Sequence, residues 1–289
     1  MKIAITGAGG LVGGFLARHL SAEHEVLALT RHALNITDRE GVRRFCLSER
    51  PDVMINCAVI GVDECERDPA LAEAINIAGP QVIAEATTEI GAEFLHFSTN
   101  YVFDGEPHGR APYTIDDEPH AINVYGSTKL AGERAIRAAS QRSFIIRSSW
   151  IYGSGKDNFL SRAHRHLLAG EPIRAIADVW ASTTYVGDLS ARVSEILAHH
   201  QYGIYHVVNS GVCSYYDFAV EAAREIDLSD VEAGHLIEKV SEADMRRLAR
   251  RPRYTPMRCL LSERLGLAPM RDWQAALAGY IHLDRSVNR

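Results

Sequence analysis

The chain has 289 residues, of which 46% are apolar and 24% are charged, a composition typical of a folded globular protein. At about 150 residues per domain, this length predicts two domains or one large α/β unit. Asp and Glu number 37 against 31 Lys and Arg, and the resulting net charge of -6 excludes a generally basic nucleic-acid binder.

Apolar runs alternate with amphipathic stretches in the first half of the chain. Strands are predicted at residues 2–6, 25–30, 53–58, 93–98 and 143–150, and helices at residues 11–20, 69–89 and 124–139. Strands separated by helices indicate βαβ units and a parallel sheet.

The pattern is less regular after Trp150. Strand-like segments at 173–176 and 203–208 alternate with helical segments at 159–168, 188–199 and 216–225, and an Arg-rich stretch follows at 246–253. These segments predict a smaller second lobe, built from separate parts of the chain and packed against the first.

A glycine-rich turn joins the first strand to the first helix, with the spacing G-x-x-G-x-x-G. Glycine permits a tight turn and lets a pyrophosphate approach the backbone, and the helix that follows supplies free N–H groups and partial positive charge. The strand–turn–helix context favours dinucleotide binding over a turn that serves packing alone. The residues expected to contact the cofactor here are Gly7, Gly10, Leu11, Val12 and Gly13.

The second strand ends at Leu29-Thr30-Arg31, with no carboxylate to accept hydrogen bonds from ribose hydroxyls. Arg31 instead suits the 2′-phosphate of NADPH, so we expect NADPH as the cofactor, with NADH as the alternative. The other interpretation of Arg31 is a solvated loop residue.

Tyr125 and Lys129 form a Y-x-x-x-K pair on the helix predicted at 124–139. The i, i+4 spacing puts phenol and ammonium on one face, where the cation would lower the pKa of the tyrosine and make it a better proton donor and acceptor. Such a pair alone is often a surface feature. Here it follows a strand that ends at Ser98-Thr99-Asn100, which can bring a hydroxyl beside the phenol.

Together these features resemble the extended short-chain dehydrogenases/reductases, and longer strings resemble the dTDP-4-dehydrorhamnose reductase family. Those strings are STNYVFDG at 98–105, YGSTK at 125–129, RSSWIYG at 147–153, LNITD at 34–38, RPDV at 50–53 and RPRY at 251–254. The resemblance covers nearly the whole chain, and its motifs occur in order.

The resemblance implies an α/β fold, a Rossmann-type doubly wound parallel sheet with a smaller, discontinuous α/β substrate-binding lobe. We expect the NAD(P)-binding core at residues 1–150 and 177–210, and the lobe at residues 151–176 and 211–289. The active site is expected between them.

The implied reaction is NAD(P)H-dependent reduction of the 4-keto group of a dTDP-6-deoxy-hexulose. Tyr125 would protonate the developing alkoxide, Lys129 would hold the nicotinamide ribose and Thr99 would hydrogen-bond the same oxygen. Further cofactor contacts are expected at Asn35, Ile36, Cys57, Ala58 and Asn76, and substrate contacts at Thr99, Asn100, Val102, Trp150 and Arg251. Trp150 matches an aromatic of the sugar site, although a Trp at a strand end is often part of a core.

Three positions depart from the family pattern. Asn100 stands where the family has Asp, so a group able to exchange protons is replaced by an amide. Asn35 replaces another Asp, but its amide oxygen can still accept a hydrogen bond from adenine. Residues 180–184 replace a Gly-Ser-Pro-Thr stretch of the substrate lobe, which makes the sugar the least secure part of the prediction.

The Arg-rich stretch, Arg246 to Arg253, is either a phosphate clamp or a solvated loop, and Arg251 is favoured for the clamp because it falls in the family's Arg-Pro string. We expect no metal site, because the histidine pairs lack the spacing of a catalytic zinc site. Five scattered cysteines, no signal peptide and no run of about 18 apolar residues predict a cytoplasmic protein without a membrane span.

Two alternatives to the reductase remain open in the sequence. One is another nucleotide-sugar ketoreductase or an epimerase of the same superfamily. The other is a nucleotide-binding regulatory subunit without turnover, because the resemblance extends to a regulatory subunit of methionine adenosyltransferase. Dimers are common in the superfamily, so a homodimer is a candidate assembly, but no sequence feature decides it.

Overall fold

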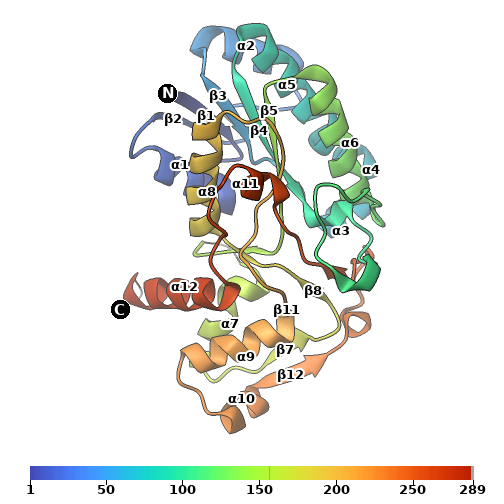
Figure 1. Cartoon of the computed structure of the whole chain (residues 1–289), viewed down its shortest axis with the longest axis vertical. Helices are drawn as coiled ribbons and strands as arrows, with labels where there is room; N and C mark the ends of the chain where they lie inside the picture. The colour runs from blue at the N-terminus through green and yellow to red at the C-terminus, as the bar shows by residue number, and fades with distance from the viewer. Residues whose placement is uncertain (156, 288–289) are drawn as a thin grey trace.

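The computed structural model describes residues 1–155 and 157–287 and has a central parallel sheet with a smaller lobe below it (Figure 1). The central sheet has six strands, in the spatial order β10 (Gly203–His206), β5 (Ser143–Ser148), β4 (Glu93–Thr99), β3 (Val53–Asn56), β1 (Lys2–Thr6) and β2 (Glu25–Leu29). Every neighbouring pair in it is parallel. The predicted α/β class with a doubly wound parallel sheet is confirmed.

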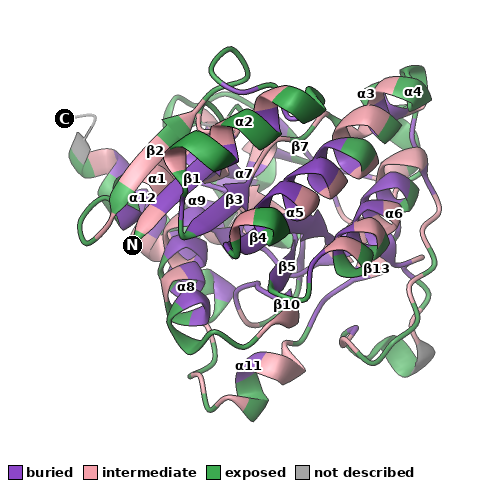
Figure 2. Cartoon of the chain, turned by 90° about the horizontal axis from the view of Figure 1, so that it is seen from above, coloured by how far each residue is buried: buried purple, intermediate pink, exposed green. Residues whose placement is uncertain are grey.

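Helices cover both faces of this sheet, because side chains of successive strand residues point to opposite sides. Ile3 and Ile5 of β1 pack toward α1 and α8, whereas Ala4 packs toward α2, α5 and α6. Figure 2 shows the strands buried between helices whose outer faces are exposed. These helices are α1 (Leu11–Leu20), α8 (Val186–His199), α2 (Arg39–Glu49), α5 (Gly79–Ile90) and α6 (Val124–Ala139).

Chain order reverses in the sheet at β1, which has β2 on one side and β3 on the other. In open α/β sheets, ligands bind in the crevice outside the carboxyl ends of the strands at this reversal. The glycine-rich turn follows β1, and Cys57 and Ala58 follow β3. The fold therefore brings these two segments together at the expected crevice.

The helix predicted at 69–89 is interrupted in the structure. It consists of α4 (Pro69–Glu73), one π-helical turn η1 (Ala74–Ala78) and α5, and the short α3 (Val62–Arg67) precedes it. A Cβ added at Gly132 of α6 would lie 2.1 Å from the backbone oxygen of Asn76 in η1. This close contact fixes α6, which carries Tyr125 and Lys129, against the π-helical turn.

The smaller lobe has three short sheets and its own apolar core. The sheets are β11 (Cys213–Ser214) with β8 (Trp180–Ala181) and β13 (Tyr254–Thr255), β12 (Ile237–Val240) with β7 (Ile173–Ile176), and β6 (Ile151–Tyr152) with β9 (Thr184–Tyr185). The helices are α7 (Phe159–Leu168), α9 (Tyr215–Glu225), α10 (Asp230–Leu236) and α12 (Trp273–Val287). Three single turns, η2 (Asn100–Val102), η3 (His108–Arg110) and η4 (Glu242–Met245), lie in the connections.

Two segments lie elsewhere than expected. Strands β8 and β9, which fall in the 177–210 range expected in the core, pair in the short sheets of the smaller lobe. Helix α11 (Leu260–Arg264), placed in the smaller lobe by the sequence, packs with Leu261 and Leu265 against the apolar core of the central sheet, beside β10. Within the described residues, 1–155 and 157–287, no helix is long and apolar enough to cross a membrane.

Candidate active site

The glycine-rich turn has a geometry that only glycine can adopt at two positions. Gly7 has a φ of +69°, and a Cβ there would lie 2.6 Å from the carbonyl carbon of Cys57. A Cβ at Gly13 would lie 2.5 Å from the backbone oxygen of Gly7. Helix α1 begins here with no side chain bonded to its first N–H groups, which leaves them available to an anion.

A cavity of about 410 Å³ opens beside this turn at the carboxyl ends of β1 and β3. Among its lining residues are seven that the sequence predicted for the cofactor: Gly7, Gly10, Arg31, Asn35, Ile36, Cys57 and Ala58. Asn35 keeps its amide oxygen toward Thr37, whose N–H donates to it at 3.2 Å. The bare glycine backbone and this adjoining cavity fit a dinucleotide.

Some lining residues of this cavity were missed by the sequence analysis. They are apolar or small side chains directly after β3 and on α4 and η1: Val59, Ile60, Leu71, Ala74 and Ile75. Their apolar character resembles that of ordinary core positions, so only the topology reveals them. Six predicted cofactor contacts do not appear among the lining residues: Leu11, Val12, Gly13, Asn76, Tyr125 and Lys129. The first three follow the turn directly.

Asn76 lies under the site rather than in its wall. Its side chain is fully buried, and Nδ2 donates to the Thr128 hydroxyl at 3.0 Å. Its Oδ1 has no hydrogen-bond partner within the described part of the chain. In this structure Asn76 fixes η1 against α6.

Tyr125 and Thr99 lie side by side because α6 and η2 pack closely. A Cβ at Gly126 would lie 2.0 Å from the Tyr101 oxygen, and the Tyr101 and Tyr125 rings meet edge to face at 5.9 Å. Burial raises the pKa of Tyr125, and a hydrogen bond with Thr99 opposes that shift. The sequence therefore placed a hydroxyl beside the phenol correctly.

Asn100 holds the Thr99 hydroxyl from the other side. Thr99 Oγ1 donates to Asn100 Oδ1 at 3.3 Å and accepts from the Tyr101 N–H at 3.2 Å. Asn100 Nδ2 donates to Thr255 Oγ1 at 2.7 Å. The amide that departs from the family pattern thus has a definite partner on β13.

Lys129 is turned into the interior. Its Nζ donates to the Phe97 oxygen at 2.5 Å and lies 3.0 Å from His96 Nε2. Burial lowers the pKa of Lys129 to about 8, against the opposing effect of Glu133. The expected lowering of the Tyr125 pKa by this lysine is not found in this arrangement, because burial dominates at Tyr125 and Nζ faces His96.

A buried ion pair supports the site from beneath. Arg147 of β5 donates to both oxygens of Glu133 at 3.0 and 2.7 Å, and the Ser98 hydroxyl donates to the same carboxylate. Ser98 directly precedes Thr99 on β4, and Glu133 lies on α6 with Tyr125, so these bonds fix strands β4 and β5 to helix α6 at the site.

The two apolar residues predicted for the substrate have different surroundings. Trp150, half-buried and with a φ of +42°, stacks on Tyr215 of the smaller lobe with ring centroids 3.9 Å apart. Val102 is fully buried in a cluster with Phe103 and Tyr113. Trp150 therefore packs against the smaller lobe, whereas the side chain of Val102 belongs to the core.

The Arg-rich stretch lines a second cavity of about 410 Å³ next to Asp104 and Ile122. It contributes five arginines to that wall: Arg246, Arg247, Arg250, Arg251 and Arg253. Arg251, the favoured phosphate ligand, is bonded through both Nη atoms to Asp63 of α3, at 3.1 and 2.9 Å. Arg246, Arg250 and Arg253 are the exposed ones.

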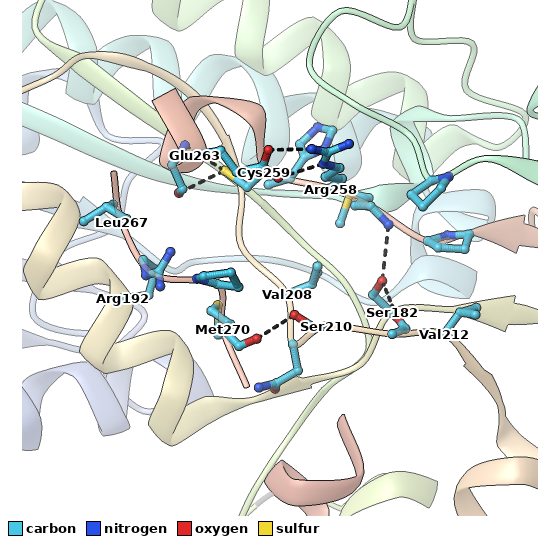
Figure 3. Close-up of a pocket in the computed structure, with 18 of the residues that line it drawn as sticks. Ser182, Arg192, Val208, Ser210, Val212, Arg258, Cys259, Glu263, Leu267 and Met270 are labelled. Atoms are coloured by element: carbon cyan, nitrogen blue, oxygen red, sulfur yellow. Dashed lines mark hydrogen bonds and ion pairs between the residues drawn. The ribbon is translucent and has the colours of Figure 1, made fainter. Parts of the chain in front are cut away.

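A third cavity, about 360 Å³, lies on another part of the surface (Figure 3). Ser210 donates to the Met270 oxygen at 2.6 Å in its wall, and Arg258 pairs with Glu263. None of the residues predicted from the sequence lines it. Across the residues that the structure describes, no group of three or more His, Cys, Asp or Glu side chains could hold a metal ion.

A family model described as the RmlD substrate binding domain matches residues 1–285 of the chain. The chain belongs to this family. A curated relative, the dTDP-4-dehydrorhamnose reductase of Mycolicibacterium smegmatis, is 40% identical over 280 residues, which are 96% of this chain and 84% of that one.

Solved structures agree with this membership of the RmlD family. A dTDP-4-dehydrorhamnose reductase of Clostridium acetobutylicum has a TM-score of 0.90 and 34% identity, covering 99% of this chain and 100% of that one. The dTDP-4-dehydrorhamnose reductase of Bacillus anthracis, in complex with NADP, has a TM-score of 0.90 and 31% identity, covering 97% and 98%.

Proposed function

We propose that this protein is an NAD(P)H-dependent oxidoreductase that reduces the 4-keto group of a dTDP-6-deoxy-hexulose in deoxysugar biosynthesis. The observation that carries the proposal is the Thr99 hydroxyl within hydrogen-bonding reach of the Tyr125 phenol. Relatives that span nearly the whole chain are named as dTDP-4-dehydrorhamnose reductases, and one is solved with NADP.

The cofactor would lie along the glycine turn, with its pyrophosphate at the start of α1. Arg31 lines the cavity and would pair with a 2′-phosphate, which favours NADPH while NADH remains usable. Asn35 and Ile36 would border the adenine, and Lys129 would reach the nicotinamide ribose. The bound cofactor supplies the hydride for the ketone carbon.

Tyr125 would give its phenolic proton to the oxygen that becomes an alkoxide as the ketone is reduced. Burial keeps the pKa of Tyr125 high, so the phenol holds its proton until a strong base forms. Thr99 would turn its single hydroxyl proton from Asn100 Oδ1, 3.3 Å away in this structure, to the same oxygen. The site thus stabilises negative charge where it develops.

The substrate would bind with its diphosphate in the arginine-lined cavity and its sugar toward Tyr125. Arg246, Arg250 and Arg253 are exposed there and suit phosphate oxygens. Arg251 would act by fixing this loop to Asp63 of α3. Trp150, stacked on Tyr215, would present an aromatic surface to the sugar ring.

The arrangement of the chain supports three further proposals. We propose that residues 1–150 and 177–210 form the cofactor core and residues 151–176 and 211–289 the substrate lobe, with α11 attached to the core and the short strands β8 and β9 attached to the lobe. We also propose that the protein acts in the cytoplasm. A homodimer is proposed as its assembly.

The test is turnover of dTDP-4-keto-6-deoxy-glucose or its rhamno epimer with NADPH, followed by the absorbance of the reduced nicotinamide. We expect stoichiometric oxidation of NADPH, loss of about a hundredfold or more in kcat for Tyr125→Phe, and no loss for Tyr202→Phe at the opposite end of the sheet. Cofactor binding without turnover of any ketosugar would contradict the proposal and favour the regulatory subunit. Product formation without net NADPH oxidation would identify an epimerase.

A further inference from the structure

A chain of buried polar side chains runs under the candidate site, from β1 through β3 and β4 to α6. Its members are Thr6, Asn56, His96 and Lys129, and none is more than 1% exposed. Since water does not reach these groups, each proton between them must be shared by one donor and one acceptor.

The orientation of the Asn56 amide is fixed by the backbone. The N–H of Ala58 donates to Asn56 Oδ1 at 3.1 Å, and the Thr6 hydroxyl donates to the same oxygen at 2.7 Å. A backbone N–H is always a donor, so this atom of Asn56 is the oxygen. The Nδ2 of Asn56 therefore faces His96 Nδ1, at 3.1 Å.

This orientation decides the tautomer of His96. Because Asn56 Nδ2 donates, His96 Nδ1 must accept, and a histidine that accepts at Nδ1 is neutral with its proton on Nε2. Burial and the neighbouring Lys129 also lower the pKa of His96 well below its ordinary value.

The proton on His96 Nε2 faces Lys129 Nζ at 3.0 Å. Nζ must then offer a lone pair, and a lysine has one only as a neutral amine. One of its own N–H groups is donated to the Phe97 oxygen at 2.5 Å. With Lys129 uncharged, each hydrogen bond from the Ala58 N–H through Asn56, His96 and Lys129 to the Phe97 oxygen has one donor and one acceptor.

The other titratable groups around Lys129 are compatible with a neutral amine. Glu133, on the same helix, is already paired with Arg147 at 2.7 Å. Burial raises the pKa of the Cys57 and Cys65 thiols, on the β3 and α3 sides, so both stay uncharged. Burial likewise raises the pKa of Tyr125 on α6.

We propose that His96 is a positioning residue that holds Lys129 inward as a neutral amine in the cofactor-free protein, and that Lys129 gains a proton and leaves His96 when NADP(H) binds. The proton comes from the buffer and adds to the Nζ lone pair. The ammonium can no longer accept from Nε2–H, so the hydrogen bond to His96 breaks and Nζ is released toward the cofactor. The second half of this proposal rests on the proposed function; the first half concerns the free protein.

Titration calorimetry with NADP⁺ measures the proton directly, in Tris and in EPPS, two buffers of different ionisation enthalpy. At about pH 8.5 we expect uptake approaching about one proton per bound cofactor, falling toward zero as the pH is lowered through about 7. Correspondingly, the Kd for NADP⁺ should rise by up to about tenfold per pH unit above about pH 8. Uptake near zero at the higher pH would overturn the proposal.

The Asn56→Asp variant reverses the pattern of donors with almost no change in shape. A carboxylate accepts from Ala58 and also from His96 Nδ1–H, so Nε2 becomes an acceptor and Lys129 is held as an ammonium. We expect proton uptake to disappear and the Kd for NADP⁺ to lose its dependence on pH in this range. The matched control is Thr6→Val, which removes a hydrogen bond from the same amide oxygen while Ala58 still fixes it. Because Thr6 also lines the cofactor cavity, the quantity compared is the uptake per bound cofactor, which this variant should keep whatever its affinity. Equal uptake in both variants would contradict the inference.

The ¹⁵N spectrum of the histidine rings tests the free protein without cofactor or substitution. At about pH 9, His96, assigned by its absence in His96→Gln, should show the Nε2–H tautomer in the unsubstituted protein and Nδ1–H in Asn56→Asp. An Nδ1–H tautomer in the unsubstituted protein would overturn the proposal even if turnover is normal. Failure of the protein to bind NADP⁺ would instead contradict the proposed function, and it would not affect the tautomer measured in the free protein.

Discussion

Asn100 illustrates how one substituted side chain is accommodated by a single partner. Its Oδ1 accepts from Thr99 and its Nδ2 donates to Thr255 at 2.7 Å. Asn100 is 2% exposed, so the amide has no access to water if Thr255 is changed. The effect of having Asn instead of Asp at position 100 therefore depends on the Thr255 hydroxyl of β13.

We predict that Thr255→Val lowers the free energy of unfolding by about 1–3 kcal/mol, because it leaves a buried N–H without an acceptor. Thr255→Ser keeps the hydroxyl and should cost well under half as much. Urea unfolding followed by circular dichroism measures both. Equal losses for the two variants would mean that the methyl group, and not the hydrogen bond, matters at this position.

At the scale of elements, helix α6 is positioned by two glycines that allow close contact. The approach of Gly126 to η2 brings Tyr125 beside Thr99, and the approach of Gly132 to η1 fixes the middle of the helix. Both contacts are with backbone atoms, which cannot rotate away as the end of a flexible side chain can.

We predict that Gly132→Ala destabilises the protein by about 1–3 kcal/mol and lowers turnover, because the added methyl displaces α6 from η1. The control is Gly234→Ala in α10, where the added Cβ would meet nothing within 4 Å. That variant should be neutral or stabilise by up to about 1 kcal/mol through helix propensity. Thermal unfolding of both variants decides, and a Gly132→Ala protein as stable as Gly234→Ala would contradict the packing argument.

The comparison of sequence with structure also belongs to the scale of elements. Helix α6 was predicted with its observed bounds, because the apolar pattern of a helix is a local signal. The π-helical turn within the predicted 69–89 helix was not predicted from the sequence, because it depends on the contact with Gly132 of α6. Residues that act through distant partners, such as His96 on Lys129 or Asp63 on Arg251, carry no local pattern that would reveal them.

At the scale of the whole molecule, a chain of net charge -6 is proposed to bind two polyanions. The structure gathers five arginines in the wall of one cavity, and it opens the start of α1 beside Arg31 in the wall of another. Local positive potential is thus concentrated at the two proposed anion sites. Net charge sets solubility and long-range steering, whereas affinity depends on the charges within about 10 Å of the ligand.

We predict that replacing the exposed Arg246, Arg250 and Arg253 singly with Ala raises the KM for the dTDP-sugar while kcat stays within about twofold. An exposed arginine bonded to a phosphate contributes about 1 kcal/mol, or about fivefold in KM. These interactions are screened by salt. Raising the ionic strength should therefore increase the KM of the unsubstituted protein more than the KM of a triple variant in which all three arginines are replaced by Ala. Arg224→Ala on α9, where Arg224 already pairs with Glu221 at 3.3 Å, is the matched control for loss of one surface charge. If Arg224→Ala raises KM as much as the three cavity variants do, the effect is one of total charge, and the arginine-lined cavity is not where the diphosphate binds.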